Sequence, residues 1–198
     1  MCIPANIAVE DLLSEIVVRR IAAISGLYCI GTCYKRGGYG YLKNTINGFN
    51  NAAKGTPFIV LCDLEDECAP SLIANWLRNP KHPNLIFRVA VREVEAWLLA
   101  DAEGISSYLG VSQSNVPGNA DNIEDPKLTI IELAKRSKNR QLRLGIVPVT
   151  GSSAHVGPDY NGLLSIFVKT TWNIDRACNN SNSLCRAVKA ITSFVPTR

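Results

Sequence analysis

Four short, almost continuously apolar runs alternate with longer amphipathic segments in the first half of the chain, and this alternation restricts the fold more than any other feature. In the amphipathic segments, apolar side chains recur every three or four residues, which is the spacing of one helix face. Strands that are apolar on both faces occur in parallel sheets covered by helices on both sides. The sequence therefore predicts an α/β fold with a parallel sheet, whose strands lie in residues 5–9, 27–33, 58–64 and 84–91.

The character of the chain changes after residue 111. Residues 112–126, SQSNVPGNADNIEDP, are polar and contain two prolines and one glycine, a composition typical of a loop. Residues 127–198 regain helical periodicity, with Lys and Arg between the apolar positions. We predict an α/β core over 1–111, a loop over 112–126 and a basic, all-helical extension over 127–198 that packs on the core to give one compact unit.

The two parts of the chain differ in charge. Residues 1–126 hold 10 Lys and Arg against 14 Asp and Glu, a balance of −4, whereas residues 127–198 hold 11 against 3, a balance of +8. An acidic site suits a cation, and a basic surface suits a polyanion such as a nucleic acid. A solvated, lysine-rich face explains the basic part equally well.

The sequence contains no apolar run long enough to span a bilayer, and its first residues lack the basic and apolar regions of a signal peptide. We therefore predict a cytoplasmic protein that does not enter a membrane. The seven cysteines are odd in number and several lie in apolar segments, which predicts reduced thiols rather than a disulfide framework. With no Cys-x-x-Cys pair and two histidines, the sequence argues against a structural zinc site.

The third apolar run ends in a dense group of acids, PFIVLCDLEDE at residues 57–67. Carboxylates this close repel one another unless a cation lies between them. Residues i and i+2 of an extended segment point to the same side, so Asp63 and Glu65 share a face. Two such carboxylates provide half of the octahedral oxygen site that Mg²⁺, or Mn²⁺ in its place, prefers. A solvated acidic turn and a general acid/base pair are the alternatives.

Other acids follow the other predicted strands. Sites in parallel sheets form at the carboxyl ends of the strands, where Glu10 follows the first apolar run. Glu10 is the natural third member of the site, as a metal ligand or as the base that takes a proton from an attacking group. Glu93 and Glu95 follow the fourth run, and we favour Glu95 as a further metal ligand. The alternative is that both acids stabilise a helix N-terminus.

This arrangement resembles the Toprim domain of topoisomerases, bacterial primases and OLD-family nucleases, whose hallmark is a Glu after the first strand and Asp-x-Asp after the third. The chain more closely resembles a family of small bacterial Toprim-like proteins, in VEDLLSE, RGGYGYLK, PFIVLCDLEDECAP, RVAVREVEAWLLAD, EDPK, GPDYN and SLCRAV. One departure is Glu65, which stands where the hallmark has Asp and relaxes the ligand geometry by its extra methylene.

The resemblance implies a Toprim-like, Rossmannoid sheet and a Mg²⁺-dependent nuclease in which Glu10, Asp63 and Glu65 are the catalytic residues. It also implies an ATPase encoded alongside and a role in defence against phage. The chain has no Walker-type Gly-x-x-x-x-Gly-Lys-Ser/Thr motif, so any nucleotide hydrolysis would come from that partner.

Several cations are candidates for binding the phosphates of a nucleic acid. Lys35 and Arg36 precede a glycine-rich loop that could approach a phosphate backbone closely. The run KRSKNRQLR contains no acid and would give salt-dependent, sequence-independent affinity, although a solvated helix end has the same composition. The full set of predicted phosphate-binding residues is Lys35, Arg36, Arg92, Lys127, Lys135, Arg136, Lys138 and Arg140.

The leading functional hypothesis is a Mg²⁺-dependent nuclease, or phosphodiesterase, that acts on nucleic acid. The first alternative is a non-catalytic regulatory or interaction subunit with a degenerate Toprim site. The second is a phosphotransferase or phosphatase acting on small nucleotides, for which the basic extension would be irrelevant. The sequence is compatible with a homo-oligomer.

Overall fold

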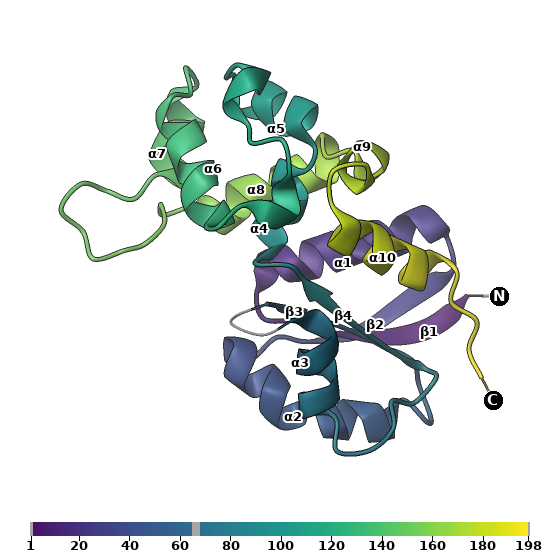
Figure 1. Ribbon diagram of the computed structural model, residues 1–198. Coiled ribbons are helices and arrows are strands. Elements are labelled where there is room, and N and C mark those ends of the chain that lie inside the picture. The colour runs from purple at the N-terminus through teal and green to yellow at the C-terminus, as the bar shows by residue number, and fades with distance from the viewer. Residues whose placement is uncertain (1, 65–67, 198) are drawn as a thin grey trace. The chain divides into compact units, whose positions relative to one another are not determined.

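The computed structural model describes residues 2–64 and 68–197, and the chain forms two compact units. Met1–Val91 and Cys185–Arg198 form the first, here called the sheet unit, and Arg92–Leu184 form the second, here called the helical unit. The predicted α/β fold with a parallel sheet flanked by helices is confirmed (Figure 1). The boundary between the units lies at the end of the fourth strand, about twenty residues before the change in composition that suggested it.

The sheet has four strands in the order β2-β1-β3-β4, and every neighbouring pair is parallel. From β1 the chain crosses to β2 on one side, then returns to place β3 on the other side of β1. The topology therefore reverses between β1 and β3. The strands are β1 (Ile3–Ala8), β2 (Tyr28–Tyr34), β3 (Phe58–Asp63) and β4 (Leu85–Ala90).

Helices cover both faces of the sheet, with α1 (Leu12–Ser25) on one face and α2 (Gly38–Ala52) and α3 (Ala69–Trp76) on the other (Figure 1). This double cover explains why β3 is apolar at successive positions, because alternate side chains enter opposite cores. The core shared with α2 and α3 includes Phe58, Val60, Cys62, Leu42, Ile46, Phe49, Leu72 and Trp76.

The last segment of the chain belongs to the sheet unit. Helix α10 (Asn182–Thr192) begins in the helical unit, and from Cys185 onward its residues belong to the sheet unit. The hydroxyl of Tyr28 donates a hydrogen bond to the Ile191 carbonyl at 2.6 Å. The backbone N–H of Thr197 donates to Oδ1 of Asn84 at 2.8 Å. The helical periodicity of this segment is visible in the sequence, but its long-range partners are not.

The helical unit is built around two fully buried tryptophans. Indole Nε1 of Trp172 donates to the Trp97 carbonyl at 3.2 Å, and Nε1 of Trp97 donates to Oγ of Ser183 at 2.7 Å. The predicted loop at 112–126 contains two short 3₁₀ turns, Gln113–Asn115 and Ala120–Asn122. The unit's helices are α4 (Val94–Leu99), α5 (Ala102–Leu109), α6 (Pro126–Lys135), α7 (Arg140–Ile146), α8 (Tyr160–Thr170) and α9 (Ile174–Cys178).

Side chains of polar residues fix where several of these helices begin. Asp101, Asp125 and Asn139 each accept a backbone N–H from the first turn of the helix that follows. Such caps satisfy donors that the helix itself leaves without partners.

The prediction of reduced cysteines is wrong for one pair. Cys2 and Cys29 form a disulfide with Cα atoms 5.6 Å apart, which links the starts of the adjacent strands β1 and β2. The sequence could not reveal this pair, because the two residues become neighbours only once the strands align. The cysteines that form no disulfide are Cys33, Cys62, Cys68, Cys178 and Cys185.

In the part of the chain that the structure describes, no helix combines the length and the apolar character needed to cross a membrane.

Candidate functional site

The carboxyl ends of β1 and β3 lie side by side at the point where the sheet topology reverses. In open α/β sheets, this is the position at which ligands bind, because the loops that follow the two strands diverge there. Two of the predicted catalytic residues lie at this edge. Glu10 stands between the end of β1 and Asp11, the residue that caps α1, and Asp63 is the last residue of β3.

A hydrogen bond joins these two acids directly. The backbone N–H of Asp63 donates to Oε1 of Glu10 at 2.8 Å, although the two residues are 53 positions apart. Both residues are partly exposed, so neither is enclosed in the core. The predicted convergence of Glu10 and Asp63 is therefore present in the folded chain.

Asp63 has an ordered position because β3 continues to pair up to its last residue. Asp63 lies opposite Ala90 in the ladder with β4, and the next N–H, of Leu64, donates to the Ala90 carbonyl at 3.0 Å. The backbone of Asp63 is thus held by β4 on one side and by Glu10 on the other. Such rigid support is the usual way to hold a metal-binding carboxylate in place.

The third predicted ligand, Glu65, lies outside the described residues. Within the residues that the structure does describe, no group of three or more His, Cys, Asp or Glu side chains is gathered as a metal site. Glu10 and Asp63 nevertheless fit part of a Mg²⁺ or Mn²⁺ site, because carboxylate oxygens at a partly exposed edge are the ligands these ions prefer and water supplies the rest.

The loop before α2 brings Lys35 close to the first turn of α1. Nζ of Lys35 lies 2.8 Å from Oε2 of Glu15, and Nε of Arg19 lies 2.8 Å from Oε1 of the same carboxylate. Burial, the largest single influence, raises the pKa of Glu15, but the bonds from Lys35 and Arg19 outweigh it and leave that pKa lowered. Lys35 is therefore engaged in an ion pair, whereas Arg36 is exposed.

The Cys33 thiol lies beside this ion pair. Burial, and then the negative charge of Glu15, raises the pKa of Cys33 to about 11. The thiol is therefore protonated at neutral pH and is a poor nucleophile.

In the helical unit, Glu93, Glu95, Lys127 and Tyr160 form a second polar group, here called the Lys127 cluster. Nζ of Lys127 lies 3.0 Å from Oε1 of Glu93 and 3.8 Å from Oε1 of Glu95. The backbone N–H of Lys127 also donates to Oε2 of Glu93, at 3.3 Å. The Tyr160 hydroxyl donates to Oε1 of Glu95 at 3.2 Å, and only 3% of Glu95 is exposed.

The Lys127 cluster gives Glu95 partners other than a metal. Glu95 was predicted to be a metal ligand, but the Lys127 ammonium and the Tyr160 hydroxyl already contact its carboxylate. Likewise Lys127, predicted to bind phosphate, sits next to two carboxylates. Arg92 is exposed and has a left-handed backbone with φ of 66°, an uncommon conformation for a residue other than glycine.

Tyr160 is a partner of Glu95 that the sequence alone did not identify. The signal was present, because GPDYN, EDPK and RVAVREVEAWLLAD are three of the stretches that resemble the Toprim-like family. The structure brings one residue or more from each of these three stretches into the Lys127 cluster.

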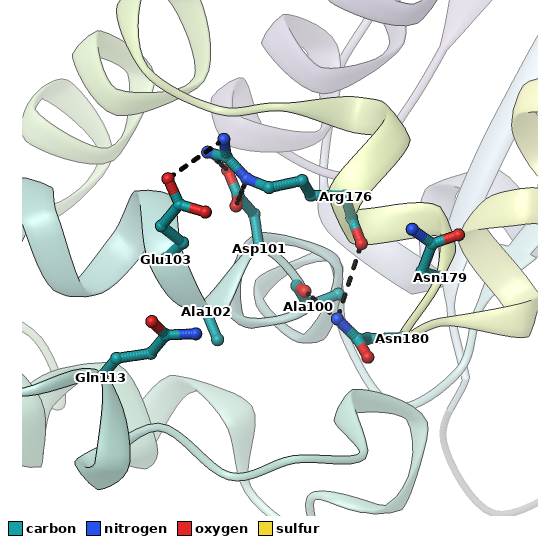
Figure 2. Close-up of a pocket in the computed structure, with 8 residues that line it drawn as sticks. All are labelled: Ala100, Asp101, Ala102, Glu103, Gln113, Arg176, Asn179 and Asn180. Atoms are coloured by element: carbon teal, nitrogen blue, oxygen red, sulfur yellow. Dashed lines mark hydrogen bonds and ion pairs between the residues drawn. The ribbon is translucent and has the colours of Figure 1, made fainter.

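Asp101 anchors another polar group in the helical unit (Figure 2). Its carboxylate is fully buried and lies 2.8 Å from Nε of Arg176. It also accepts the backbone N–H groups of Gly104 and Asn173, at 3.1 and 2.8 Å. A Cβ on Gly104 would overlap Oδ2 of Asp101, so this contact requires glycine.

The hollow beside this pair does not have the size of a small-molecule site. Its volume is about 160 Å³, and it is lined by Asp101, Glu103, Gln113, Arg176 and Asn180 among others (Figure 2). Pockets that bind small molecules usually measure roughly 300–1,000 Å³. Because Asp101 is occupied by Arg176 and two N–H groups, we assign the group a structural role.

The predicted basic run lies at the end of α6 and the start of α7. Lys135 pairs with Glu132 at 2.5 Å, and the run's last member, Arg143, donates from Nη1 to the Ser137 carbonyl. Cations near a helix C-terminus also stabilise the helix, which gives Lys135 a structural role. The exposed cations of the run are Lys135, Arg136, Lys138 and Arg140.

Comparison with known proteins adds no relative. The chain matches no protein-family model, no curated protein and no solved structure. The resemblance to Toprim domains therefore stays a prediction from the motifs, and the assignment of the site rests on the geometry of the sheet edge.

Proposed function

We propose that the protein is a Mg²⁺-dependent phosphodiesterase that cleaves nucleic acid at the edge formed by Glu10 and Asp63. The observation that carries this proposal is the hydrogen bond from the Asp63 N–H to Oε1 of Glu10 at the reversal point of the sheet. It puts two acids from distant parts of the sequence at the position where parallel sheets bind their ligands.

The roles of the two acids follow from their surroundings. Asp63, supported by β4, would hold the metal, and Glu10 would share it or accept a proton from the attacking water. A divalent ion supplies Lewis-acid stabilisation of the charge that develops on phosphoryl oxygens and lowers the pKa of water. Glu65 follows Asp63 by two residues and completes the proposed ligand set.

The test is cleavage of a panel of single- and double-stranded DNA and RNA by purified protein with Mg²⁺ or Mn²⁺. Asp63→Asn keeps the size of the side chain but removes its charge, and we expect cleavage to fall roughly 100-fold or more. The control is Asp175→Asn, which removes one exposed acid from α9 and should cleave like the wild type. Equal cleavage by all three proteins would refute the proposed site.

One observation favours the non-catalytic alternative. Oε1 of Glu10 already accepts a backbone N–H, so this acid has a structural task whether or not a metal binds. Glu10→Gln separates the two hypotheses, because the amide oxygen still accepts the N–H while the charge is lost. Unchanged folding with lost cleavage supports catalysis, whereas a wild-type protein that binds no metal and cleaves nothing supports an interaction subunit.

We add to this proposal an ATPase partner and a role in defence against phage. Both rest on the resemblance to the Toprim-like family alone. Co-expression with a neighbouring ATPase, followed by affinity capture and size-exclusion chromatography, would test the association directly.

A further inference from the structure

A pocket in the sheet unit has the size of a small-molecule site. Its volume is about 480 Å³, and it is here called the Tyr34 pocket after the last residue of β2, which lines it. The other lining residues come from α2 and from the start of β3, and they include Asn44, Gly48, Phe49 and Phe58. Pockets that bind small molecules usually measure roughly 300–1,000 Å³. The Tyr34 pocket is therefore large enough for a heterocyclic ring system.

Three aromatic side chains line the Tyr34 pocket and pack against one another. The ring centroids of Tyr34 and Phe49 are 5.4 Å apart, and the ring of Phe58 lies 5.9 Å from Tyr34 and 5.2 Å from Phe49. Phe49 and Phe58 are buried, whereas Tyr34 is half-buried. None of the described residues that line the pocket carries a charge. An aromatic, uncharged surface of this kind favours a flat, uncharged ring as its ligand.

Two polar groups at the Tyr34 pocket are available to such a ligand. Among the residues that the structure describes, none forms a hydrogen bond with the side-chain amide of Asn44 or with the hydroxyl of Tyr34. The amide has two donors and an acceptor, and the hydroxyl both donates and accepts. A nucleobase is a flat ring whose edge carries donors and acceptors, so it matches the aromatic surface and the two polar groups together.

The Tyr34 pocket begins close to the strand end that carries Glu10. Tyr34 lies opposite Ala8 in the ladder between β1 and β2, and its carbonyl accepts the N–H of Val9 at 3.0 Å. Glu10 is the next residue of the chain. One end of the pocket is thus at the edge of the sheet to which we assign cleavage.

The charge of the surrounding chain supplies the remaining feature of a nucleotide site. Residues 35–62 contain no acid and four cations, Lys35, Arg36, Lys43 and Lys54. Lys43 precedes Asn44 in α2, Lys54 follows that helix closely, and both are exposed. An uncharged pocket with cations on neighbouring residues suits an uncharged base attached to an anionic phosphate. We propose that the Tyr34 pocket binds an unpaired nucleobase of a single-stranded nucleic acid beside the proposed cleavage site.

This inference rests on the proposed function for the identity of its ligand, but it is tested without catalysis. A base enters such a pocket only from outside the stack of a duplex, so single strands should bind more tightly than duplexes of the same sequence. Binding of fluorescein-labelled DNA and RNA is measured by anisotropy in EDTA. The critical comparison uses an abasic oligonucleotide of the same length, which keeps the phosphates and lacks the bases.

Gly48→Leu fills the Tyr34 pocket without removing a contact from the fold. A Cβ at Gly48 would meet no atom within 4 Å, and Leu is favoured over Gly inside a helix, so the Tm should equal or exceed that of the wild type. The matched control is Gly40→Leu. Gly40 is exposed on the same helix, an added Cβ there also meets no atom within 4 Å, and this residue does not line the pocket.

The preference for bases over bare phosphates is the expected readout. The wild type and Gly40→Leu should bind the intact oligonucleotide roughly tenfold or more tightly than the abasic one, because a base packed on aromatic rings adds affinity that phosphates do not supply. Gly48→Leu should lose most of this preference. Asn44→Ala removes one exposed amide and should reduce the preference about fivefold, and it keeps the test available if Gly48→Leu does not fold.

Several results would overturn the assignment. Equal affinity of the wild type for the intact and abasic oligonucleotides would leave only phosphate contacts, and an undiminished preference in Gly48→Leu would place the base elsewhere. If Gly48→Leu changes only the elution volume in size-exclusion chromatography, the pocket belongs to a contact between copies of the chain. Displacement of the oligonucleotide by AMP, GMP, CMP or UMP at the concentrations at which an unlabelled strand competes would assign the pocket to a free nucleotide instead.

The same measurements separate this inference from the proposed function. A base preference that depends on Gly48, in a protein that cleaves no substrate, would retain the Tyr34 pocket and reject the nuclease activity. Full cleavage by Gly48→Leu, together with an undiminished base preference, would retain the nuclease activity and reject the pocket.

Discussion

The two units of the protein differ in whether their buried charged groups have partners. In the helical unit, the buried carboxylates of Asp101 and Glu95 each contact a cation and at least one further hydrogen-bond donor. In the sheet unit, Arg88 is partly buried, and its Nε atom is inaccessible to solvent and has no hydrogen-bond acceptor among the described residues. Removing one partner from a buried charge pair is strongly destabilising, whereas a buried donor without an acceptor already lowers the stability of the fold. The two units should therefore respond in opposite ways when a buried charge is removed.

Among the substitutions that test this difference, Asp101→Ala should have the largest effect on stability. The substitution removes the acceptor of two backbone N–H groups and of the Arg176 guanidinium from a fully buried position. We expect the free energy of unfolding of the helical unit to fall by about 3–4 kcal/mol, measured by urea denaturation. Asp175→Ala, an exposed acid close in sequence to Arg176, should change it by less than about 0.5 kcal/mol. A small loss for Asp101→Ala would mean that the compensated charges do not stabilise this unit.

The sheet unit should depend instead on its covalent link. Reduction of the Cys2–Cys29 disulfide opens a loop of 27 residues, and the chain-entropy argument predicts a loss of up to about 3.5 kcal/mol. Urea denaturation with and without a phosphine reductant measures the loss. The double variant Cys2→Ser with Cys29→Ser should match the reduced wild type and show no further response to reductant. A wild type that is insensitive to reduction would show that strand pairing alone fixes β2.

The Lys127 cluster should give a smaller effect. We expect a coupling energy of about 1 kcal/mol between Glu93 and Lys127 in the double-mutant cycle of Glu93→Gln and Lys127→Met, because both side chains are partly exposed. Stability of the single and double variants by urea denaturation supplies the four corners of the cycle. If Lys127→Met instead stabilises the protein, Lys127 belongs with the uncompensated cations and its role in binding phosphate gains support.

The stability of the sheet unit should depend weakly on pH in the alkaline range. The folded protein raises the pKa of Cys33 from 9.0 to about 11, so folding favours the protonated thiol. Its contribution is complete below pH 9 and is lost as pH rises through about 11. Urea midpoints between pH 8 and 11 should fall less steeply in Cys33→Ala than in the wild type, whereas Cys185→Ala, at an exposed position, should follow the wild type.

The smallest effect on stability is expected from the exposed basic run. Neutralising Lys135, Arg136 and Lys138 together should change the free energy of unfolding by less than about 0.5 kcal/mol, because all three are exposed. The same variant should weaken nucleic-acid binding if the run contacts phosphates, and leave it unchanged if the run is only a solvated helix end.

The sequence was sufficient for the fold class because apolar runs of strand length that alternate with amphipathic helices are typical of parallel sheets covered on both faces. The convergence of Glu10 and Asp63 could also be anticipated, since both follow apolar runs and carboxyl ends of parallel strands share an edge. The fold class did not need the order of the strands, whereas the contact between Glu10 and Asp63 requires β1 and β3 to be neighbours.

The sequence could not predict features that depend on contacts between distant segments. The disulfide requires β1 and β2 to be neighbours, and the hydrogen bond from Tyr28 to the Ile191 carbonyl requires the last helix to return to the sheet unit from the far end of the chain. In the apolar segment NLIFRVAV, nothing distinguishes Arg88 from any other polar residue of a strand. Tyr160 and Lys127 likewise acquire their partners through the packing of α4, α6 and α8.

The positions of the tryptophans give each unit its own optical reporter. The chain has three tryptophans, of which Trp76 is buried in the core of the sheet unit and Trp97 and Trp172 are buried in the helical unit. In a Trp76→Phe protein, indole fluorescence therefore reports unfolding of the helical unit, and the difference from the wild type reports the sheet unit. The two stabilities can be followed in a single sample with no added dye, and a ligand that protects one unit can be told from a ligand that protects the other.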